Sequence, residues 1–436
     1  MVYFLRFLAF FFGRIFRPFR KRWKPGQPIR CLVVGYGGAN NTGAEARTDE
    51  AIKQMLAADD RLHITITALD RERMLRYTRE HARLEVRQIH MTFVFSILRL
   101  ALRSDMLVLI EGSCFKENFS QALFWFFMYS ADLAQRFGLP TVTYAVDAGR
   151  LRAANKAWGK KVAERIDLLM TRTAAAKGIL TDDLGVRNEV VVTTDTAFTI
   201  EPETASWACK ELERHGCDST KPTIGIAFEE LFWWPVIPSF WRYITGQKED
   251  QYKSIYYHTW PNDGVKRSKR MKDAVANFAT WASQEFGVNV VFFAMERLDA
   301  DPCRDVIGIM NGSNALFDSD HYNARQMTAL LRELSMLVTC RYHALVLSMG
   351  GGVPVIGLAH DERIATMMDE VGLKKKYFIN YQESDIEEKL KNMSFELMNE
   401  REAVNKRILE SIPTYLSRMA ENEKHFIELL NEKFPV

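Results

Sequence analysis

The chain has 436 residues, 47% of them hydrophobic and 26% charged, which is enough for two folded cores and excludes a disordered or repetitive protein. Its net charge of +3 is uneven, because residues 1–30 contain eight basic residues and no acidic one, while the other residues sum to −5. This distribution argues against a nucleic-acid-binding protein, in which basic charge usually covers a folded face. The six cysteines have no metal-ligand spacing, so no structural zinc is expected.

Residues 1–28 mix phenylalanines with arginines and lysines. The longest apolar run, Phe7 to Phe12, is far shorter than the about 20 residues that a membrane-spanning helix needs. On a helical wheel most phenylalanines share one side, and the other side holds Arg6, Gly13, Arg14, Arg17 and Lys21, with Tyr3 and Phe10 intruding. The segment therefore predicts an amphipathic membrane helix, peripheral or monotopic, on the anionic cytoplasmic face of the cell membrane. A helix packed on the protein itself, or a disordered tail, is the alternative.

Residues 29–205 have the pattern of an N-terminal Rossmann-like domain, in which apolar strands alternate with helices. The strand at residues 30–35 leads into a turn rich in glycine and asparagine, Gly35–Gly43, and then into a helix. This geometry directs backbone N–H groups at an anion. The dinucleotide pattern GxGxxG is not met, because Asn40 stands where its third glycine is needed. A tight turn without a ligand is the alternative.

Two further strands of this domain end in polar turns. The strand at residues 105–110 ends at Glu111-Gly112-Ser113, and the strand at residues 141–146 ends at Asp147. The carboxyl ends of parallel strands meet at one edge of a sheet, where ligands gather. The candidate acceptor- or anion-binding residues at this edge are Gly37, Asn40, Asn41, Glu45, Glu111 and Asp147.

Residues 220–380 predict a second Rossmann-like domain. It carries an insertion at residues 229–262, rich in tryptophan and tyrosine, which fits a cleft wall, a sugar-stacking surface, a membrane contact or a self-packed loop. Residues 381–436 predict C-terminal helices, broken near Pro413, that pack back across the first domain.

The most informative segment of the second domain is Arg341-Tyr342-His343, between an apolar strand and a helix. A helix N-terminus attracts anions, and Arg341 adds a planar cation that suits carboxylate or phosphate. His343 can exchange a proton near neutral pH. Arg363, after the next strand, adds a second cation. Capping or surface residues without a function are the alternative.

These residues resemble the polysaccharide pyruvyl transferase family. The likeness covers Arg341–Leu345, its flanking strand and Gly352–Leu358, and it extends to Gly35–Glu45. Its most specific part is Arg341–Ala344. Single positions also agree, namely Arg172, Gly185, Val186 and Asp195. The resemblance covers about residues 30–375 and implies an α/β fold with two Rossmann-like domains in a GT-B-like arrangement. The first domain would lie on the acceptor side and the second on the donor side.

The resemblance also implies an activity. Phosphoenolpyruvate would donate its pyruvyl group to a hydroxyl pair of a surface or capsular polysaccharide precursor, forming a pyruvate ketal. Phosphoenolpyruvate would be a co-substrate, with no cofactor and no metal. The implied catalytic residues are His343 and Arg341, and the implied donor-binding residues are Arg341, His343, Arg363 and Arg172. We expect His343 to be the general acid and Glu45, Glu111 or Asp147 the base.

The sequence departs from the family at Ala44, Glu111, Arg150 and Thr173, where the family has Asp, Gly, Pro and an acidic residue. Two alternatives therefore stay open. One is a GT-B glycosyltransferase using a nucleotide-sugar, and the other is a catalytically silent member acting as a membrane scaffold in glycan assembly. The expected partners are phosphoenolpyruvate, a glycan acceptor that a polyprenyl diphosphate could carry, and an anionic membrane surface, with no nucleic acid.

Overall fold

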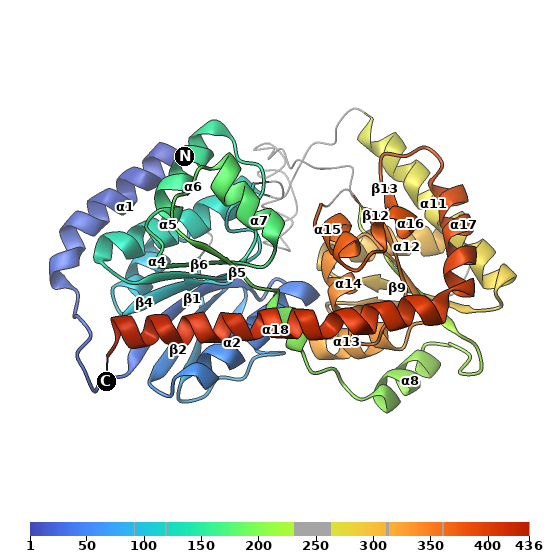
Figure 1. The fold of residues 1–436 in the computed structure, drawn as a ribbon, viewed down its shortest axis with the longest axis horizontal. Coiled ribbons are helices and arrows are strands. Elements are labelled where there is room, and N and C mark those ends of the chain that lie inside the picture. The colour runs from blue at the N-terminus through green and yellow to red at the C-terminus, as the bar shows by residue number, and fades with distance from the viewer. Residues whose placement is uncertain (91, 118–119, 231–262, 311–313, 360–361, 436) are drawn as a thin grey trace. The chain divides into compact units, whose positions relative to one another are not determined.

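The computed structural model describes residues 1–90, 92–117, 120–230, 263–310, 314–359 and 362–435 (Figure 1). The chain forms two compact units. Unit 1 comprises Met1–Ala39, Ala44–Thr196 and Tyr415–Val436, and unit 2 comprises Asn40–Gly43 and Ala197–Thr414. Of the expected aromatic insertion at residues 229–262, all but the first two residues lie outside the described part of the chain.

Unit 1 contains a seven-stranded parallel sheet in the order β3-β2-β1-β4-β5-β6-β7. Its strands are β1 (Ile29–Gly37), β2 (Leu62–Ala68), β3 (Leu84–Gln88), β4 (Met106–Leu109), β5 (Thr141–Val146), β6 (Leu168–Thr171) and β7 (Val190–Val192). The central strands are almost wholly buried, as continuous apolar runs in a parallel sheet require.

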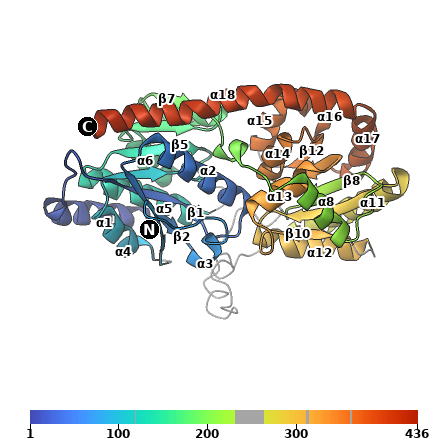
Figure 2. The ribbon, with the colours of Figure 1, turned by 90° about the horizontal axis from the view of Figure 1, so that it is seen from below.

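Alternate residues of these strands face two different cores. Leu32 and Val34 face a core that also contains buried side chains of α1 (Val2–Phe16), α4 (Val94–Ala101), α5 (Gln121–Phe137) and α6 (Ala153–Ala163). Cys31 and Val33 face the other core, which is covered by α2 (Thr42–Ala58) and by the last residues of α18 (Arg401–Lys433). The sheet of unit 1 is thus covered by helices on both faces (Figure 2). The shorter helices of this unit are α3 (Arg71–Met74) and α7 (Ala174–Gly178).

Helix α1 packs on α5 and buries Leu5, Ala9 and Phe12. A Cβ atom at Gly13 would lie 2.6 Å from Cβ of Arg136, so this glycine allows the two helices to approach closely. The helical wheel placed Gly13 on the polar side with the arginines, whereas in the structure Gly13 is buried against α5. Among the described residues, no helix has the length and apolar character needed to cross a membrane.

Unit 2 contains a six-stranded parallel sheet in the order β10-β9-β8-β11-β12-β13. Its strands are β8 (Thr223–Ala227), β9 (Asn289–Ala294), β10 (Leu316–Asp318), β11 (Met336–Thr339), β12 (Val355–Ala359) and β13 (Phe378–Asn380). Counted from β8, this is the Rossmann order 3-2-1-4-5-6. The strand order reverses between β8 and β11, which is where such sheets bind ligands.

The helices of unit 2 surround this sheet. They are α8 (Ala205–Arg214), α11 (Gly264–Glu285), α12 (Ala300–Ile309), α13 (Ala324–Arg332), α14 (Tyr342–Met349), α15 (Glu362–Glu370), α16 (Lys374–Tyr377) and α17 (Ile386–Asn399). The helix break expected near Pro413 is wrong, because α18 runs through Pro413 and the break from α17 lies at Glu400. Pro413 is exposed, so its ring and its missing N–H disturb only the solvent-facing side of the helix.

Candidate functional site

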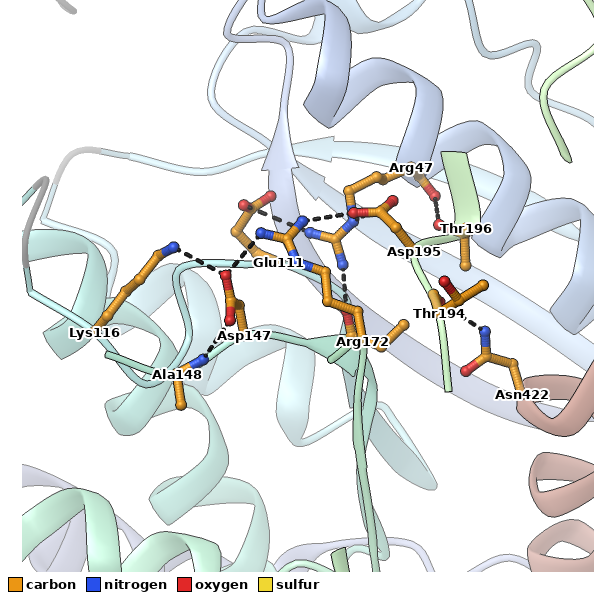
Figure 3. A network of polar contacts seen from close by, with 11 residues as sticks. Arg47, Glu111, Lys116, Asp147, Ala148, Arg172, Thr194, Asp195, Thr196 and Asn422 are labelled. Atoms are coloured by element: carbon orange, nitrogen blue, oxygen red, sulfur yellow. Dashed lines mark hydrogen bonds and ion pairs between the residues drawn. The ribbon is translucent and has the colours of Figure 1, made fainter. Parts of the chain in front are cut away.

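Two buried arginines connect the strand ends of unit 1 (Figure 3). Arg172, directly after β6, places Nη2 2.8 Å from Oδ2 of Asp147 and Nη1 2.5 Å from Oδ2 of Asp195. Arg47, on α2, places Nε 3.2 Å from Oδ1 of Asp195 and Nη1 3.8 Å from Oε1 of Glu111. The side chains of Arg172 and Asp195 have no exposed surface. The carboxylates expected at this edge are therefore gathered around cations.

The backbone of the strand ends is shaped by the same arginines. Ala145 has a positive φ of 54° at a register shift in β5, and its carbonyl accepts a hydrogen bond of 2.7 Å from Nη2 of Arg47. A Cβ atom at Gly112 would lie 3.0 Å from a guanidinium nitrogen of both Arg47 and Arg172. Lys116 adds a third cation, 3.2 Å from Asp147. Glycine in the turn after β4 is thus explained by packing on the arginines.

Three predicted residues of unit 1, Glu111, Asp147 and Arg172, therefore lie in one network. The burial of Arg172 and its two carboxylate partners favour a structural role over the expected contact with a donor. Sequence reasoning missed Arg47 and Lys116, because neither directly follows a strand.

Gly37 and Glu45 lie on either side of the turn that connects β1 and α2. Gly37 ends β1, where a Cβ atom would lie 2.8 Å from the sulfur of Met74, so close packing accounts for the glycine. Glu45 is buried in the first turn of α2. The pKa of Tyr77 is raised, mainly by the burial of its hydroxyl and to a smaller extent by the nearby Glu45 carboxylate. This hydroxyl accepts a hydrogen bond of 3.2 Å from the backbone N–H of Gly38.

The asparagine-rich part of the predicted turn, Asn40–Gly43, belongs to unit 2. Asn40 adopts a positive φ of 50° and donates a side-chain hydrogen bond to Asp320. Its carbonyl accepts a 2.7 Å hydrogen bond from the Ser319 hydroxyl, and the N–H of Thr42 donates to the Met295 carbonyl at 2.9 Å. Asn41 pairs with Glu296 in an isolated bridge. The segment is thus fixed to residues that follow β9 and β10.

His343 lies against this segment. A Cβ atom at Gly43 would be 2.0 Å from Nδ1 of His343, so the backbone at position 43 contacts the imidazole directly. His343 is half-buried in the first turn of α14, and its ring meets that of Tyr342 edge-on at 5.0 Å. The guanidinium of Arg363 lies over the Tyr342 ring at 5.2 Å. Two segments that sequence alone placed about 300 residues apart are therefore neighbours in unit 2.

Arg341 is surrounded by three carboxylates. Its Nε lies 2.8 Å from Oδ2 of Asp299 and its Nη2 lies 2.5 Å from Oδ1 of the same residue. Nη2 also lies 3.0 Å from Glu296, and Nη1 lies 3.2 Å from Glu229. All three acids are buried, and 14% of the Arg341 side chain is exposed. The guanidinium is therefore already matched by acceptors of this chain.

The charges of this acid–arginine cluster are unbalanced, with three carboxyl groups around one guanidinium. Burial raises the pKa of Asp299 to about 6, although the neighbouring Arg341 opposes the rise. Burial lowers the pKa of Arg341, but Asp299, Glu229 and Glu296 more than offset this and keep it charged. Asp299 is thus a buried acid that titrates close to physiological pH.

Sequence reasoning missed Glu229, Glu296 and Asp299. Glu229 lies two residues after β8 and Glu296 two residues after β9, so the signal was a carboxylate after an apolar parallel strand, the pattern recognised only in the first domain. Arg341 likewise lies two residues after β11, next to β8 at the point where the strand order reverses. Within the described chain, no group of three or more His, Cys, Asp or Glu residues has the geometry to hold a metal ion.

The family model described as polysaccharide pyruvyl transferase matches residues 41–362 of this chain. A search of curated proteins found no match to this chain. Among solved structures, a glycosyltransferase from Rickettsia africae ESF-5 is similar with a TM-score of 0.56 and 9% identity, over 94% of this chain and 99% of that chain.

Two further solved structures resemble the chain. A UDP-GlcNAc 2-epimerase from Neisseria meningitidis bound to UDP-GlcNAc gives a TM-score of 0.55 at 11% identity, over 93% of this chain and 100% of that chain. TcCGT1 in complex with UDP gives 0.52 at 11% identity, over 92% and 100%. At such identities the likeness concerns the fold alone, and it confirms the expected GT-B-like class with two parallel-sheet α/β units.

Proposed function

The chain belongs to the polysaccharide pyruvyl transferase family, and from this membership we propose that it transfers the pyruvyl group of phosphoenolpyruvate to a pair of glycan hydroxyls, forming a cyclic ketal. The observation that carries this proposal is the contact between His343 and the backbone of Gly43. It joins the two most family-like segments of the chain at the N-terminus of α14, with a cation, Arg363, beside Tyr342.

In the proposed reaction, protonated His343 gives its proton to the methylene carbon of phosphoenolpyruvate, and C2 becomes an oxocarbenium-like electrophile. One sugar hydroxyl bonds to C2 and releases its proton. The bond from C2 to the phosphate oxygen then breaks, and the second hydroxyl bonds to C2 and releases its own proton. One released proton replaces the one lost by His343 and the other leaves with phosphate, so the products are the ketal and inorganic phosphate.

We assign the two arginines of the donor side different roles. Arg341 is a positioning residue, because its bonds to Asp299, Glu296 and Glu229 fix the backbone from which His343 projects. Arg363 is the cation for the donor's carboxylate or phosphate, together with the backbone N–H groups that begin α14. The base that accepts the hydroxyl protons remains one of Glu45, Glu111 and Asp147.

Calorimetric titration of the purified protein with phosphoenolpyruvate tests the donor. We expect saturable binding that Arg363→Gln weakens by about tenfold or more, because one charged hydrogen-bond donor is lost. Lys374→Gln is the matched control, since Lys374 is an exposed cation of the same unit. His343→Ala should retain binding, because the imidazole acts on the carbon and not on the anionic groups. Binding of UDP or a UDP-sugar with none of phosphoenolpyruvate would support the glycosyltransferase alternative instead.

A further inference from the structure

Helix α1 has two apolar faces, and only one of them is covered. The inner face, Val2, Leu5, Ala9 and Phe12, is buried in the core that contains α5. The outer face is mostly aromatic, with Tyr3 73%, Phe4 58%, Phe7 57%, Phe10 51% and Phe11 44% exposed. These five residues lie on one arc of a helical wheel, opposite the buried residues, and the exposed Arg14 lies on the same arc. We call them the aromatic face.

The aromatic face is exceptional within this molecule. Of the fourteen exposed large hydrophobic residues among the described residues, eight come from residues 1–19. Phe95 of α4, 69% exposed, adds to the group, because its ring lies 6.0 Å from that of Phe12. Soluble proteins expose single hydrophobic side chains commonly but contiguous apolar patches rarely, and such patches mark interaction sites. An exposed row of aromatic rings on a short helix is typical of a helix that lies in a membrane interface.

Basic residues follow directly at the end of the same helix. A pocket of about 370 Å³ in unit 1 is lined by Arg17, Arg20, Arg22 and Lys433, with Trp23 and Phe434 at its side. Its one acidic residue, Asp105, already accepts two hydrogen bonds from the Arg30 guanidinium, at 2.9 Å from Nε and 2.8 Å from Nη2. Neither Arg17 nor Arg22 forms an ion pair with a side chain in the described part of the chain. The pocket is therefore net positive, and its arginines suit a phosphate group.

We propose that α1 docks the protein on an anionic lipid bilayer, with the aromatic face among the upper acyl chains and a lipid phosphate in the basic pocket. Charge complementarity selects this occupant, since residues 1–30 carry eight basic residues and no acidic one. A second copy of the chain docking through the same face would bring two such basic segments together, which disfavours a symmetric dimer. A docked α1 would hold the protein at a membrane surface, where a lipid-carried glycan acceptor would also lie.

Co-sedimentation of the full chain with vesicles tests the aromatic face. We expect binding to phosphatidylcholine vesicles that contain phosphatidylglycerol, weaker binding to phosphatidylcholine alone, and release at high salt. Replacing Phe4, Phe7 and Phe11 by Ser should weaken binding on the order of 100-fold, because three rings leave the interface. The matched control replaces Phe395, Leu409 and Leu416 by Ser, which are 53%, 43% and 44% exposed and lie far along the chain on α17 and α18.

A second pair of variants tests the pocket. Arg17→Gln with Arg22→Gln should weaken binding to anionic vesicles about 30-fold, since each basic residue near such a surface contributes about 1 kcal/mol. Lys177→Gln with Arg187→Gln removes the same charge from exposed positions elsewhere in unit 1 and should leave binding unchanged. Equal loss in both double variants would overturn the pocket. The docking surface would be overturned if the wild type failed to bind anionic vesicles, or if the Phe4, Phe7 and Phe11 variant bound them as tightly as the wild type. It would also be overturned if the wild type formed a dimer that this variant lost, while neither protein bound vesicles.

Discussion

At the residue scale, the proposed activity depends on the contact between Gly43 and His343. The N-terminal turn of a helix readily accepts alanine, so Gly43→Ala would ordinarily cost little stability. Here the new methyl group would lie 2.0 Å from Nδ1 of His343 and must displace the ring. We expect Gly43→Ala to lower turnover about 100-fold or more, the scale of a lost general acid. The melting temperature should fall as well, because Cβ of His343 would lie 2.7 Å from the new methyl group and the backbone must shift.

The matched control is Gly308→Ala in α12, where no atom lies within 4 Å of the new Cβ. It should stabilise the protein by about 0.5–1 kcal/mol, because alanine reduces the freedom of the unfolded chain, and it should leave turnover unchanged. Wild-type turnover by Gly43→Ala would show that the His343 ring has no fixed position against this backbone.

Asp299 makes a pH-dependent contribution to stability. Its pKa is about 6 in the folded protein, raised mainly by burial from an ordinary value of 3.8. A raised pKa means that the contribution is full below the unfolded pKa and is lost as pH rises through the folded pKa. Relative to Asp299→Asn, the unfolding free energy of the wild type should therefore fall between about pH 4 and pH 6. Urea denaturation at several pH values measures this difference, and a difference that does not vary with pH would contradict the raised pKa.

The sequence predicted Arg341, His343 and Arg363 as a group, because each follows a strand in the same region of the chain. It could not predict that Arg341 meets three carboxylates, since Glu229, Glu296 and Asp299 reach it from two other strand ends. For Arg172, the family resemblance implied a role as a donor ligand. Its partners Asp147 and Asp195 lie on different strands, and only the folded sheet brings them to the arginine.

At the element scale, parallel strands were the most predictable feature. The runs at residues 31–34 and 106–110 are apolar throughout, and only a strand covered on both faces needs such a run. Helix α1 was less predictable, because a wheel drawn from sequence shows polarity but not which side finds a partner. The small side of the helix at Ala9 and Gly13 accepts α5, and this contact turns Phe4, Phe7 and Phe11 outward.

Helix α18 provides a prediction at the same scale. Pro413 cannot donate a hydrogen bond to the carbonyl of Leu409, and its ring opposes a straight helix. Because position 413 is exposed, Pro413→Ala should raise the unfolding free energy by about 1–3 kcal/mol. The greater conformational freedom of alanine in the unfolded chain reduces this gain. Thermal melting measures the change. A lower melting temperature would show that the native structure needs the proline at this point of the helix.

At the scale of the whole molecule, the two-unit α/β class was predictable because strand and helix patterns alternate in both halves of the chain. The boundaries between the two units were harder to predict from the sequence. The structure separates the units between Thr196 and Ala197, gives Asn40–Gly43 to unit 2, and gives the end of α18 to unit 1. Such exchanges depend on contacts between residues hundreds of positions apart, which local patterns do not contain.

The central claim is that this family member forms a ketal from phosphoenolpyruvate and that His343 supplies the proton. The most direct test incubates the wild type, His343→Ala and the exposed-histidine control His90→Ala with phosphoenolpyruvate and simple glycosides that carry free hydroxyl pairs. Phosphate release and the mass of the glycoside are then measured. We predict equal amounts of phosphate and pyruvate ketal with the wild type and with His90→Ala, and a loss of about 100-fold or more with His343→Ala. Undiminished ketal formation by His343→Ala, or sugar transfer from a nucleotide-sugar in place of ketal formation, would contradict the account.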